Sequence, residues 1–404
     1  MSVKAGQILH FGGTILMSRL QSAGPGQVNI PTEQVYETGN DNAVERLTDI
    51  PDISFDLESW DVTAEIEALL QRRILDDDND GQEYDFQLAQ PLNVISPYKL
   101  GKGLSAVRGG VIVPCLNLES ATYRFGVTQN ATQQFTLRGD SIYAAPGSPR
   151  YQEFTKSGVG PYTWDDTAVK TVEQGVDLYG LCVVAYETDG TYKRLFIGDD
   201  YTNTSTGFTL TAAANSAIAN GSKLGVSYAT AEVDNYADTI HPTATVKPGA
   251  LKGRDIDFYV SDGAATPTMV RWRGVQSVEF NWRVQLDRDL ELGNPHVVTQ
   301  DYDTPEVTGN AVMRPEDFDY MIARIAQING SSAALVQNAL ASTPLAVEAR
   351  LNHPTTGATL KTIYSPDARF TFPGPQARVR SKTDITFPFA SDTGDLKVYK
   401  GTRV

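Results

Sequence analysis

The stretch from Tyr36 to Ser54 recurs without a gap as Leu290 to Thr308, so the chain carries one segment twice. In each copy a Gly-Asn pair precedes an Asp-x-Pro corner, and both are typical of turns. The shared signature is Gly39, Asn40, Asp49 and Pro51 in the first copy and Gly293, Asn294, Asp303 and Pro305 in the second. Turn residues repeated at one spacing predict two modules built in the same order. The alternative is a pair of unrelated β segments that share turn chemistry.

An extended segment and a helical pattern follow each copy. After the first copy, Ile66, Leu69 and Leu70 form one apolar stripe, and Thr63 is expected to cap the helix. After the second copy, Pro315 is expected at the first helical position. The matching stripe consists of Phe318, Met321, Ile322 and Ile325. Each copy therefore predicts a strand, a corner, a second strand and a short helix.

Long alternating runs close both modules. Leu118 to Ser141 and Ala368 to Asp392 each alternate apolar and polar residues about a polar middle, which predicts a hairpin. We expect a mainly β (α+β) fold with two tandem β-barrel or β-sandwich modules, each with a short helix, and an inserted small β-sandwich. The expected ranges are 1–148 for the first module, with an N-terminal arm and a long loop at 71–110, 149–250 for the inserted outer β domain, and 251–404 for the second module.

The composition narrows the class of function. The chain has 34 lysines and arginines against 49 aspartates and glutamates, a formal charge of −15. Gripping nucleic acid requires a basic face, so this balance argues against tight binding of DNA or RNA. It is compatible with a surface past which nucleic acid slides, because like charges prevent sticking. Cys115 and Cys182 lie in apolar runs, and we expect two reduced core cysteines.

The sequence contains no recognisable catalytic or cofactor-binding motif. The histidines at 10, 241, 296 and 353 have no metal-ligand partner at helical or strand spacing. Asp76, Asp78 and Asp80 begin like a calcium loop, but Gln87 stands where the bidentate carboxylate belongs. A solvated acidic loop is therefore the favoured interpretation. We expect no metal, no cofactor and no enzymatic activity.

Three features together resemble the major tail tube proteins of long-tailed bacteriophages. They are the Asp-x-Pro corner that leads into a short helix, the closing hairpin ATYRFGVTQNATQQFTLRGD, and an acidic chain with long arms. The resemblance implies tail-tube-type barrels, in which six modules close a ring and rings stack into a hollow tube. Two modules per chain then imply a homo-oligomer with trimeric, pseudo-hexameric rings; a ring of six chains is the alternative. The inserted block, with a hairpin about Asp189-Gly190, resembles the small β-sandwich decorations of tailed-phage structural proteins.

The resemblance also implies roles for particular residues. An acidic lumen would let DNA pass without being held, and the residues expected to face it are Asp56, Glu58, Glu279, Asn281, Arg283 and Gln285. Besides an arm at each end of the chain, the residues expected to join ring to ring are Asp76, Asp77, Asp78, Asp80, Lys99 and Lys102. The implied partners are tail-tip and tail-terminator proteins and a tape measure protein in the lumen. The implied location is the virion, after assembly in the host cytoplasm.

Two other functions are compatible with these patterns. A tail-tip or baseplate ring protein would use the same barrel but form a single ring. A β-sandwich adhesin that binds carbohydrate would act through exposed aromatic residues of the inserted block.

Overall fold

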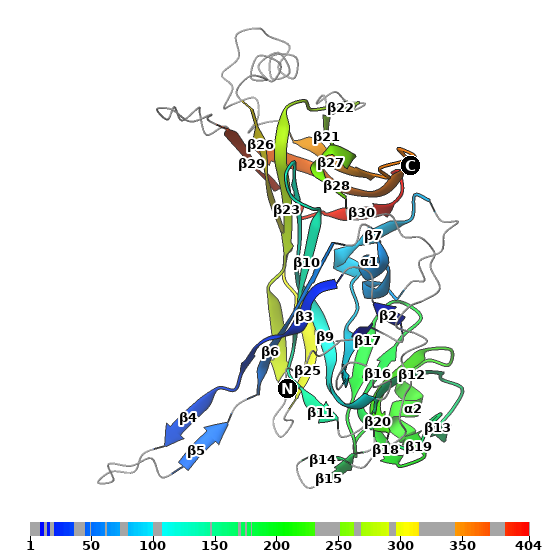
Figure 1. The fold of residues 1–404 in the computed structure, drawn as a ribbon. Helices are drawn as coiled ribbons and strands as arrows, with labels where there is room; N and C mark the ends of the chain where they lie inside the picture. The colour runs from blue at the N-terminus through cyan, green and yellow to red at the C-terminus, as the bar shows by residue number, and fades with distance from the viewer. Residues whose placement is uncertain are drawn as a thin grey trace.

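The computed structural model describes residues 9–11, 14–16, 20–35, 45–48, 50–60, 63–72, 80–99, 107–145, 148–168, 171–173, 176–178, 180–230, 251–261, 268–290, 296–314, 344–371 and 384–403. This part of the chain is mainly β, with a 17-stranded antiparallel sheet, smaller sheets and two short α-helices. None of its helices is long and apolar enough to cross a membrane. Figure 1 shows the longest strands running along the height of the molecule.

The first half of the large sheet has the strand order β2-β1-β8-β9-β10-β6-β3, and β11 pairs with the other edge of β9. The bounds are β1 Leu9–Phe11, β2 Thr14–Leu16, β3 Leu20–Asn29, β6 Asp52–Ser59, β8 Leu92–Lys99, β9 Val107–Gly126, β10 Thr132–Gly139 and β11 Tyr143–Ala145. Strands β9 and β10 are the hairpin that the alternating run at 118–141 predicts.

The second half repeats this arrangement as β22-β21-β27-β28-β29-β26-β23, with β30 on the other edge of β28. The bounds are β21 Ile256–Ser261, β22 Met269–Arg271, β23 Val275–Arg283, β26 Glu306–Met313, β27 Leu345–Asn352, β28 Thr359–Phe370, β29 Ile385–Ser391 and β30 Lys397–Lys400. A hairpin of β4 (Thr32–Val35) and β5 (Glu45–Thr48) in the first half has its counterpart in β24 (Leu286–Leu290) and β25 (Val297–Tyr302).

The two halves match in register as well as in order. Strands β6 and β26 begin at Asp52 and Glu306, an offset of 254 residues (306 − 52). Corresponding pairs are Thr32↔Thr48 with Leu286↔Tyr302, Asn29↔Asp52 with Arg283↔Glu306, and Leu118↔Leu137 with Phe370↔Phe389. A proline also recurs within a long strand, because Pro114 and Pro366 occupy matching places in β9 and β28. One arrangement of strands is therefore present twice.

The two halves are joined edge to edge. Strand β23 pairs with β26 on one side and with β9 on the other, from Ser277↔Gly126 to Arg283↔Ser120. One hydrophobic cluster spans both halves, with Phe55 and Tyr123 from the first and Trp282 from the second. The expectation of separate barrels is not met: the described strands form one open sheet over a shared core, without a closed barrel. The physical reason is that β9 and β23 satisfy each other's backbone groups and so merge two apolar faces into one.

Residues between the halves form a compact unit of two sheets. The sheet β12-β20-β16-β17 (Ser148–Thr155, Lys223–Thr230, Gly180–Tyr186 and Tyr192–Leu195) packs on β13-β19-β18 (Tyr162–Thr163, Gly207–Leu210 and Tyr201–Thr204). Strands β14 (Thr171–Glu173) and β15 (Val176–Leu178) form a separate two-stranded sheet. The hairpin about Asp189-Gly190 is confirmed as β16 and β17. The small-residue segment after β19 forms helix α2 (Ala212–Ala217), because Thr211 caps it and alanine favours helix.

The prediction of a long loop at 71–110 is wrong. This segment contains β7 (Glu83–Asp85), the 3-10 turn η1 (Phe86–Leu88), β8 and the start of β9. Its apolar residues Tyr84, Phe86 and Val94 are buried in the shared core. The prolines of this segment predict loop residues, but Pro97 lies at a register shift in β8, where a missing N–H is tolerated. The arm expected at the C-terminus is also wrong there, because β30 pairs with both β28 and β7.

Helix α1 (Glu65–Leu70) is the helix predicted after the first repeat copy. Ile66 and Leu70 are buried and Leu69 packs on the core, as the apolar stripe predicts. Thr63 is not the cap: the N-cap is Ala64, without a side-chain cap hydrogen bond, and the Thr63 carbonyl accepts from Lys361 instead. The helix expected after the second copy lies outside the described residues.

Gly309 of β26 makes a close approach that a side chain would block. A Cβ there would lie 2.2 Å from Phe389 Cζ and 2.4 Å from the backbone oxygen of Glu279. Gly309→Ala is therefore expected to lower the free energy of unfolding by about 1–3 kcal/mol through overpacking. Gly126→Ala is the control, because the nearest atom to its new Cβ is 3.7 Å away. Equal effects in chemical denaturation would contradict the prediction.

Candidate functional site: a polar face shared by both halves

Five of the six residues predicted to face a channel come together on one face of the large sheet. Asp56 and Glu58 of β6 lie opposite Thr136 and Gln134 of β10, on the side away from the buried Ile53, Phe55 and Leu57. Directly opposed residues of an antiparallel pair point to the same face, so rows can be followed across the strands. The rows are Asp56–Thr136–Ser120–Arg283–Glu306, Glu58–Gln134–Thr122–Asn281–Thr308 and Thr132–Arg124–Glu279–Asn310.

Contacts within this polar face cross the junction between the halves. Thr122 Oγ1 donates to Asn281 Oδ1 at 2.9 Å, and Arg124 Nε donates to Glu279 Oε1 at 3.1 Å. Within the first half, Thr136 Oγ1 donates to Asp56 Oδ1 at 2.9 Å. These three rows hold four carboxylates and two guanidinium groups. On the same face Arg138 lies opposite Ser54 and forms ion pairs with Asp52 at 3.5 Å and with Glu119 at 3.2 Å. Gln285 follows β23 and is exposed, but it belongs to none of the rows.

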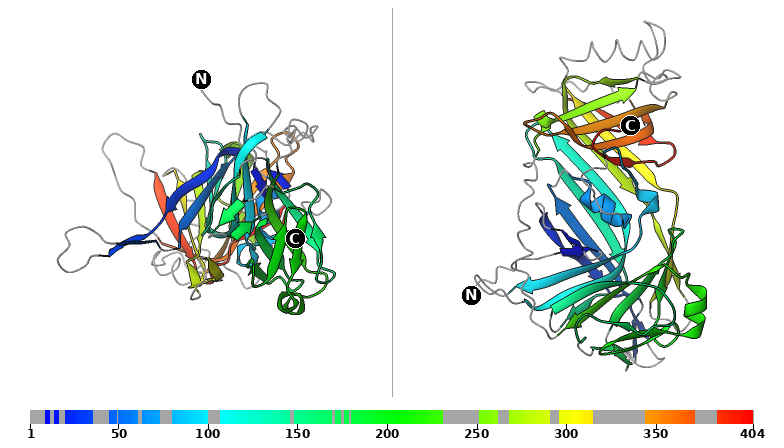
Figure 2. Two further views of the ribbon diagram at one scale, coloured as in Figure 1. Left: turned by 90° about the horizontal axis from the view of Figure 1, so that it is seen from below. Right: turned by 90° about the vertical axis from the view of Figure 1, so that its right-hand side faces the viewer.

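The opposite face of the same sheet is buried. Its side chains join α1 in the shared core, and Figures 1 and 2 show α1 and the inserted unit on one side of the long strands. Among the described elements, neither helix nor inserted sheet covers the polar face. The β4–β5 hairpin projects away from the body in Figure 1, whereas its counterpart β24–β25 lies against the inserted unit through His296 and Phe196. The polar face is therefore a surface with one side packed and the other open.

The residues predicted to join rings are only partly described. Asp80 lies in a turn beside Gly401, and Lys99 ends β8 opposite Val107. Asp76, Asp77, Asp78 and Lys102 lie outside the described residues. Gln87, the residue at the carboxylate position of the calcium-like pattern, donates Nε2 to Asp395 at 2.8 Å.

The repeat signature is described at its corner residues. Pro51 lies between β5 and β6, as the Asp-x-Pro pattern predicts. Asp303 and Pro305 lie at the matching place between β25 and β26. Asp303 Oδ1 accepts from the backbone N–H of Thr304 at 2.7 Å, a local turn contact. Gly39, Asn40, Asp49, Gly293 and Asn294 lie outside the described residues.

A buried ion pair that sequence reasoning missed connects the two halves. Lys361 of β28 contacts Glu67 of α1, and both side chains have zero exposure. Lys361 Nζ also donates to Gln133 Oε1 at 2.8 Å, and the Tyr123 hydroxyl donates to Glu67. Burial, followed by the Glu67 carboxylate, raises the pKa of Tyr123 well above its ordinary value. The signal in the sequence is Lys361 on the same side of its strand as Ile363.

A second buried ion pair attaches the inserted unit to both halves. Arg194 of β17 donates to both oxygens of Asp140, at 2.8 and 2.6 Å. Asp140 also accepts from Ser141 Oγ at 2.7 Å and from the backbone N–H of Val297 at 2.8 Å. Burial alone raises the pKa of Asp140, but the Arg194 guanidinium and hydrogen bonds from His296 and Ser141 hold it well below its ordinary value.

The two cysteines meet where the inserted unit packs on β9. Cys115 and Cys182 are buried free thiols with their sulfurs 3.1 Å apart. The hydrogen bond with Cys182 and burial raise the pKa of the Cys115 thiol well above its ordinary value. Both are core cysteines, as the sequence predicts. Among the described residues, no group of histidine, cysteine and carboxylate side chains could hold a metal ion.

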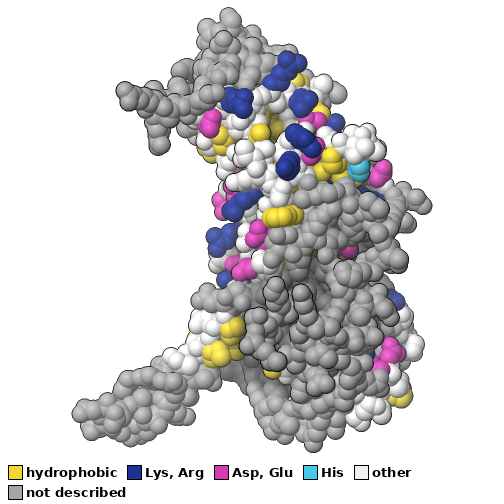
Figure 3. Space-filling model, viewed as in Figure 1, with side chains coloured by type: hydrophobic (Ala, Val, Ile, Leu, Met, Phe, Trp, Pro, Cys, Tyr) yellow, Lys and Arg dark blue, Asp and Glu magenta, His cyan; other side chains and the backbone are white. Residues whose placement is uncertain are grey.

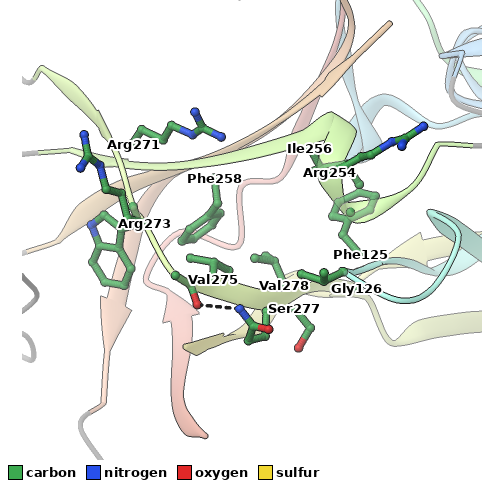
Figure 4. Close-up of a pocket in the computed structure, with 15 residues that line it drawn as sticks. Phe125, Gly126, Arg254, Ile256, Phe258, Arg271, Arg273, Val275, Ser277 and Val278 are labelled. Atoms are coloured by element: carbon green, nitrogen blue, oxygen red, sulfur yellow. Dashed lines mark hydrogen bonds between the residues drawn. The ribbon is translucent and has the colours of Figure 1, made fainter. Parts of the chain in front are cut away.

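A cavity of about 450 Å³ lies at the junction of the two halves. Phe125, Phe258 and Trp272 are among its lining residues. Arg254, Arg271 and Arg273 lie around it (Figure 4). Figure 3 shows lysine and arginine side chains gathered over this upper part of the molecule. Carboxylate, histidine and cysteine are missing from the lining, so it offers a cationic rim without a general acid, base or nucleophile. Comparison of the chain with protein families and with curated proteins finds no match.

Proposed function

We propose that the chain is a structural virion protein, the subunit of a bacteriophage tail tube whose stacked rings conduct DNA. The observation that carries this proposal is the polar face that runs unbroken from one half of the sheet to the other. The wall of a channel needs one packed face and one wet face, and this chain has two copies of such a wall side by side.

In this proposal each half is one tail-tube-type module, and the barrel closes only in the ring. Three chains supply six modules, so the open sheet of a single chain is the expected form of an incomplete barrel. Helix α1 and the inserted unit face outward, because they lie on the packed side of the sheet. Tail-tip and tail-terminator proteins would bind the two ends of the stack, and a tape measure protein would occupy the bore before DNA.

The chemistry of the lumen is repulsion rather than recognition. In the three rows of the proposed inner face, the carboxylates of Asp56, Glu58, Glu279 and Glu306 outnumber the guanidinium groups of Arg124 and Arg283. Phosphates that approach this surface release few counterions and gain little binding energy, so DNA slides without being held. The role is therefore structural and not catalytic.

Electron microscopy of the purified chain tests the proposal. We expect hollow rings or tubes with six-fold-like end views, and native mass spectrometry of a ring is expected to give three chains. Six chains per ring would favour the hexameric alternative. Rings that never stack would indicate a tail-tip or baseplate protein. A chain that stays monomeric at all concentrations would contradict the proposal, and glycan binding by that monomer would favour the adhesin.

A further inference from the structure

Three polar side chains meet on the buried side of the large sheet, where packing alone would place apolar ones. Glu67 of α1, Gln133 of β10 and Lys361 of β28 are 1%, 3% and 0% exposed. Gln133 shares its side of β10 with the buried Phe135. Lys361 shares its side of β28 with the buried Ile363. An amine, a carboxylate and a carboxamide are therefore gathered in one buried place, although lysine and glutamate are rarely buried.

The contacts in this cluster bring reactive groups together and leave others unpaired. Lys361 Nζ contacts Glu67 Oε1 and donates to Gln133 Oε1 at 2.8 Å, so the amine nitrogen lies next to the carboxamide carbon that carries Oε1. Within the described residues, Gln133 Nε2 and Glu67 Oε2 are buried without a hydrogen-bond partner. Unpaired buried polar atoms are costly, and a network built only for stability would satisfy both.

We propose that Lys361 and Gln133 join spontaneously in an amide bond, with Glu67 as the acid–base catalyst, so that the chain cross-links its own two halves. The bond runs from Lys361 Nζ to Gln133 Cδ, and ammonia is lost. Gln133 belongs to the first half and Lys361, 228 residues further along, to the second. Each chain reacts once, so this is self-modification and not enzyme turnover. The reaction lies within one chain and does not depend on assembly.

The chemical steps use only groups of the cluster. Glu67 takes a proton from the Lys361 ammonium, which leaves a neutral amine and a carboxylic acid. The amine nitrogen attacks Gln133 Cδ, and the carbonyl electron pair moves onto Oε1. Glu67 then donates its proton to Nε2 and takes one from the added nitrogen. The carbonyl forms again as the bond from Cδ to Nε2 breaks, ammonia leaves, and Glu67 ends as a carboxylic acid.

Burial favours this reaction. Charge is costly in the core, and the reaction exchanges a buried ammonium and a buried carboxylate for a neutral amide and a neutral acid. Groups held in contact react with effective concentrations far above those of free molecules in solution. The exclusion of water protects the intermediate from side reactions. Since a carboxamide is a poor electrophile, freshly folded protein holds the ion pair, and the amide forms as the protein ages.

Intact-mass spectrometry of the full chain tests the cross-link. Protein kept folded at physiological temperature for days is expected to lose about 17 Da, the mass of one ammonia, relative to fresh protein. Protease digestion is expected to give one branched peptide that contains both Gln133 and Lys361. An unchanged mass of the folded wild-type chain would overturn the proposal. A loss of about 18 Da, one water, with Lys361 joined to Glu67 would overturn the assignment of Gln133.

Gln133→Met separates the cross-link from other losses of ammonia. The variant keeps the length of the side chain and removes the carboxamide, so its mass is expected to stay constant. Gln134→Met is the matched control, because Gln134 is the next residue of β10 and lies on the polar face; it is expected to lose ammonia as the wild type does. A loss that persists in Gln133→Met without the branched peptide, as imide formation at Asn220-Gly221 would give, contradicts the proposal.

The rate of the mass loss tests the role of Glu67. Glu67→Gln is expected to lower this rate by about a hundredfold, because a carboxamide cannot take the proton of the ammonium. Glu67→Asp keeps a carboxyl group and is expected to retain the reaction at a lower rate. Circular dichroism shows which variants are folded. A folded Glu67→Gln variant that loses ammonia at the wild-type rate would overturn the assignment of Glu67 as the catalyst.

Discussion

Replacing Lys361 with methionine is expected to lower the free energy of unfolding by about 3–5 kcal/mol. The ammonium contacts Glu67, donates to Gln133 and the Thr63 carbonyl, and lies 4.9 Å from the centre of the Tyr123 ring. Its removal leaves the Glu67 carboxylate in the core without a cation, and desolvation of that charge is no longer compensated. Chemical denaturation followed by circular dichroism measures the loss.

Two further variants isolate the cause. Glu67→Gln combined with Lys361→Met removes both charges and keeps an acceptor for the Tyr123 hydroxyl, so it is expected to recover most of the loss. Lys397→Met removes the 2.8 Å ion pair with Glu83, which also joins the halves but is partly exposed. That control is expected to cost less than about 1 kcal/mol. A similar loss in both single variants would contradict the role assigned to burial.

Replacing Arg194 with methionine is expected to cost about 3–5 kcal/mol and to loosen the inserted unit. Arg194 and Asp140 are 7% and 2% exposed, and Asp140 would lose its cation while remaining buried. Limited proteolysis is expected to cut between the unit and the large sheet at a higher rate. Arg150→Met is the control, because the Arg150–Asp166 pair at 2.9 Å lies within the unit and is about one-fifth exposed. Equal proteolysis of the two variants would contradict the prediction.

The same cluster predicts a dependence of stability on pH. Because the pKa of Asp140 is lower in the folded chain than in the unfolded chain, its stabilisation is present above the unfolded pKa of about 4 and is lost as pH falls below it. The wild-type chain is therefore expected to lose more stability than Asp140→Asn between pH 5 and pH 3, measured as the denaturation midpoint. Parallel curves for the two proteins would contradict this assignment.

Local patterns predicted most of the strands. The alternation in VQSVEFNWR placed Val278, Phe280 and Trp282 on one face, and the structure buries all three. The repeat of the Asp-x-Pro corner predicted β6 and β26 at equivalent places. What local pattern did not predict was the join between β9 and β23, because pairing partners about 160 residues apart are chosen by tertiary packing. For the same reason the shared core replaced the expected separate barrels.

The candidate site shows the same division. Alternation identified Asp56, Glu58, Glu279 and Asn281 as polar-face residues, but their common face depends on β9 and β10 lying between them. The buried charges were missed because a glutamate such as Glu67 is favourable in the first turn of a helix whether it is exposed or buried. Its partner Lys361 comes from the other half of the chain, where no local rule connects the two.

Since β9 and β23 belong to one polypeptide, every second contact between modules in the proposed cylinder forms within a chain as it folds. Its effective concentration is set by the connecting chain and not by the concentration of protein. Three bodies instead of six must then give up translational and rotational freedom, which favours nucleation from dilute protein. The contacts between modules are therefore of two kinds, within a chain and between chains. The Glu67–Lys361 ion pair joins the modules of one chain, so a strained cylinder would separate first at the three contacts between chains.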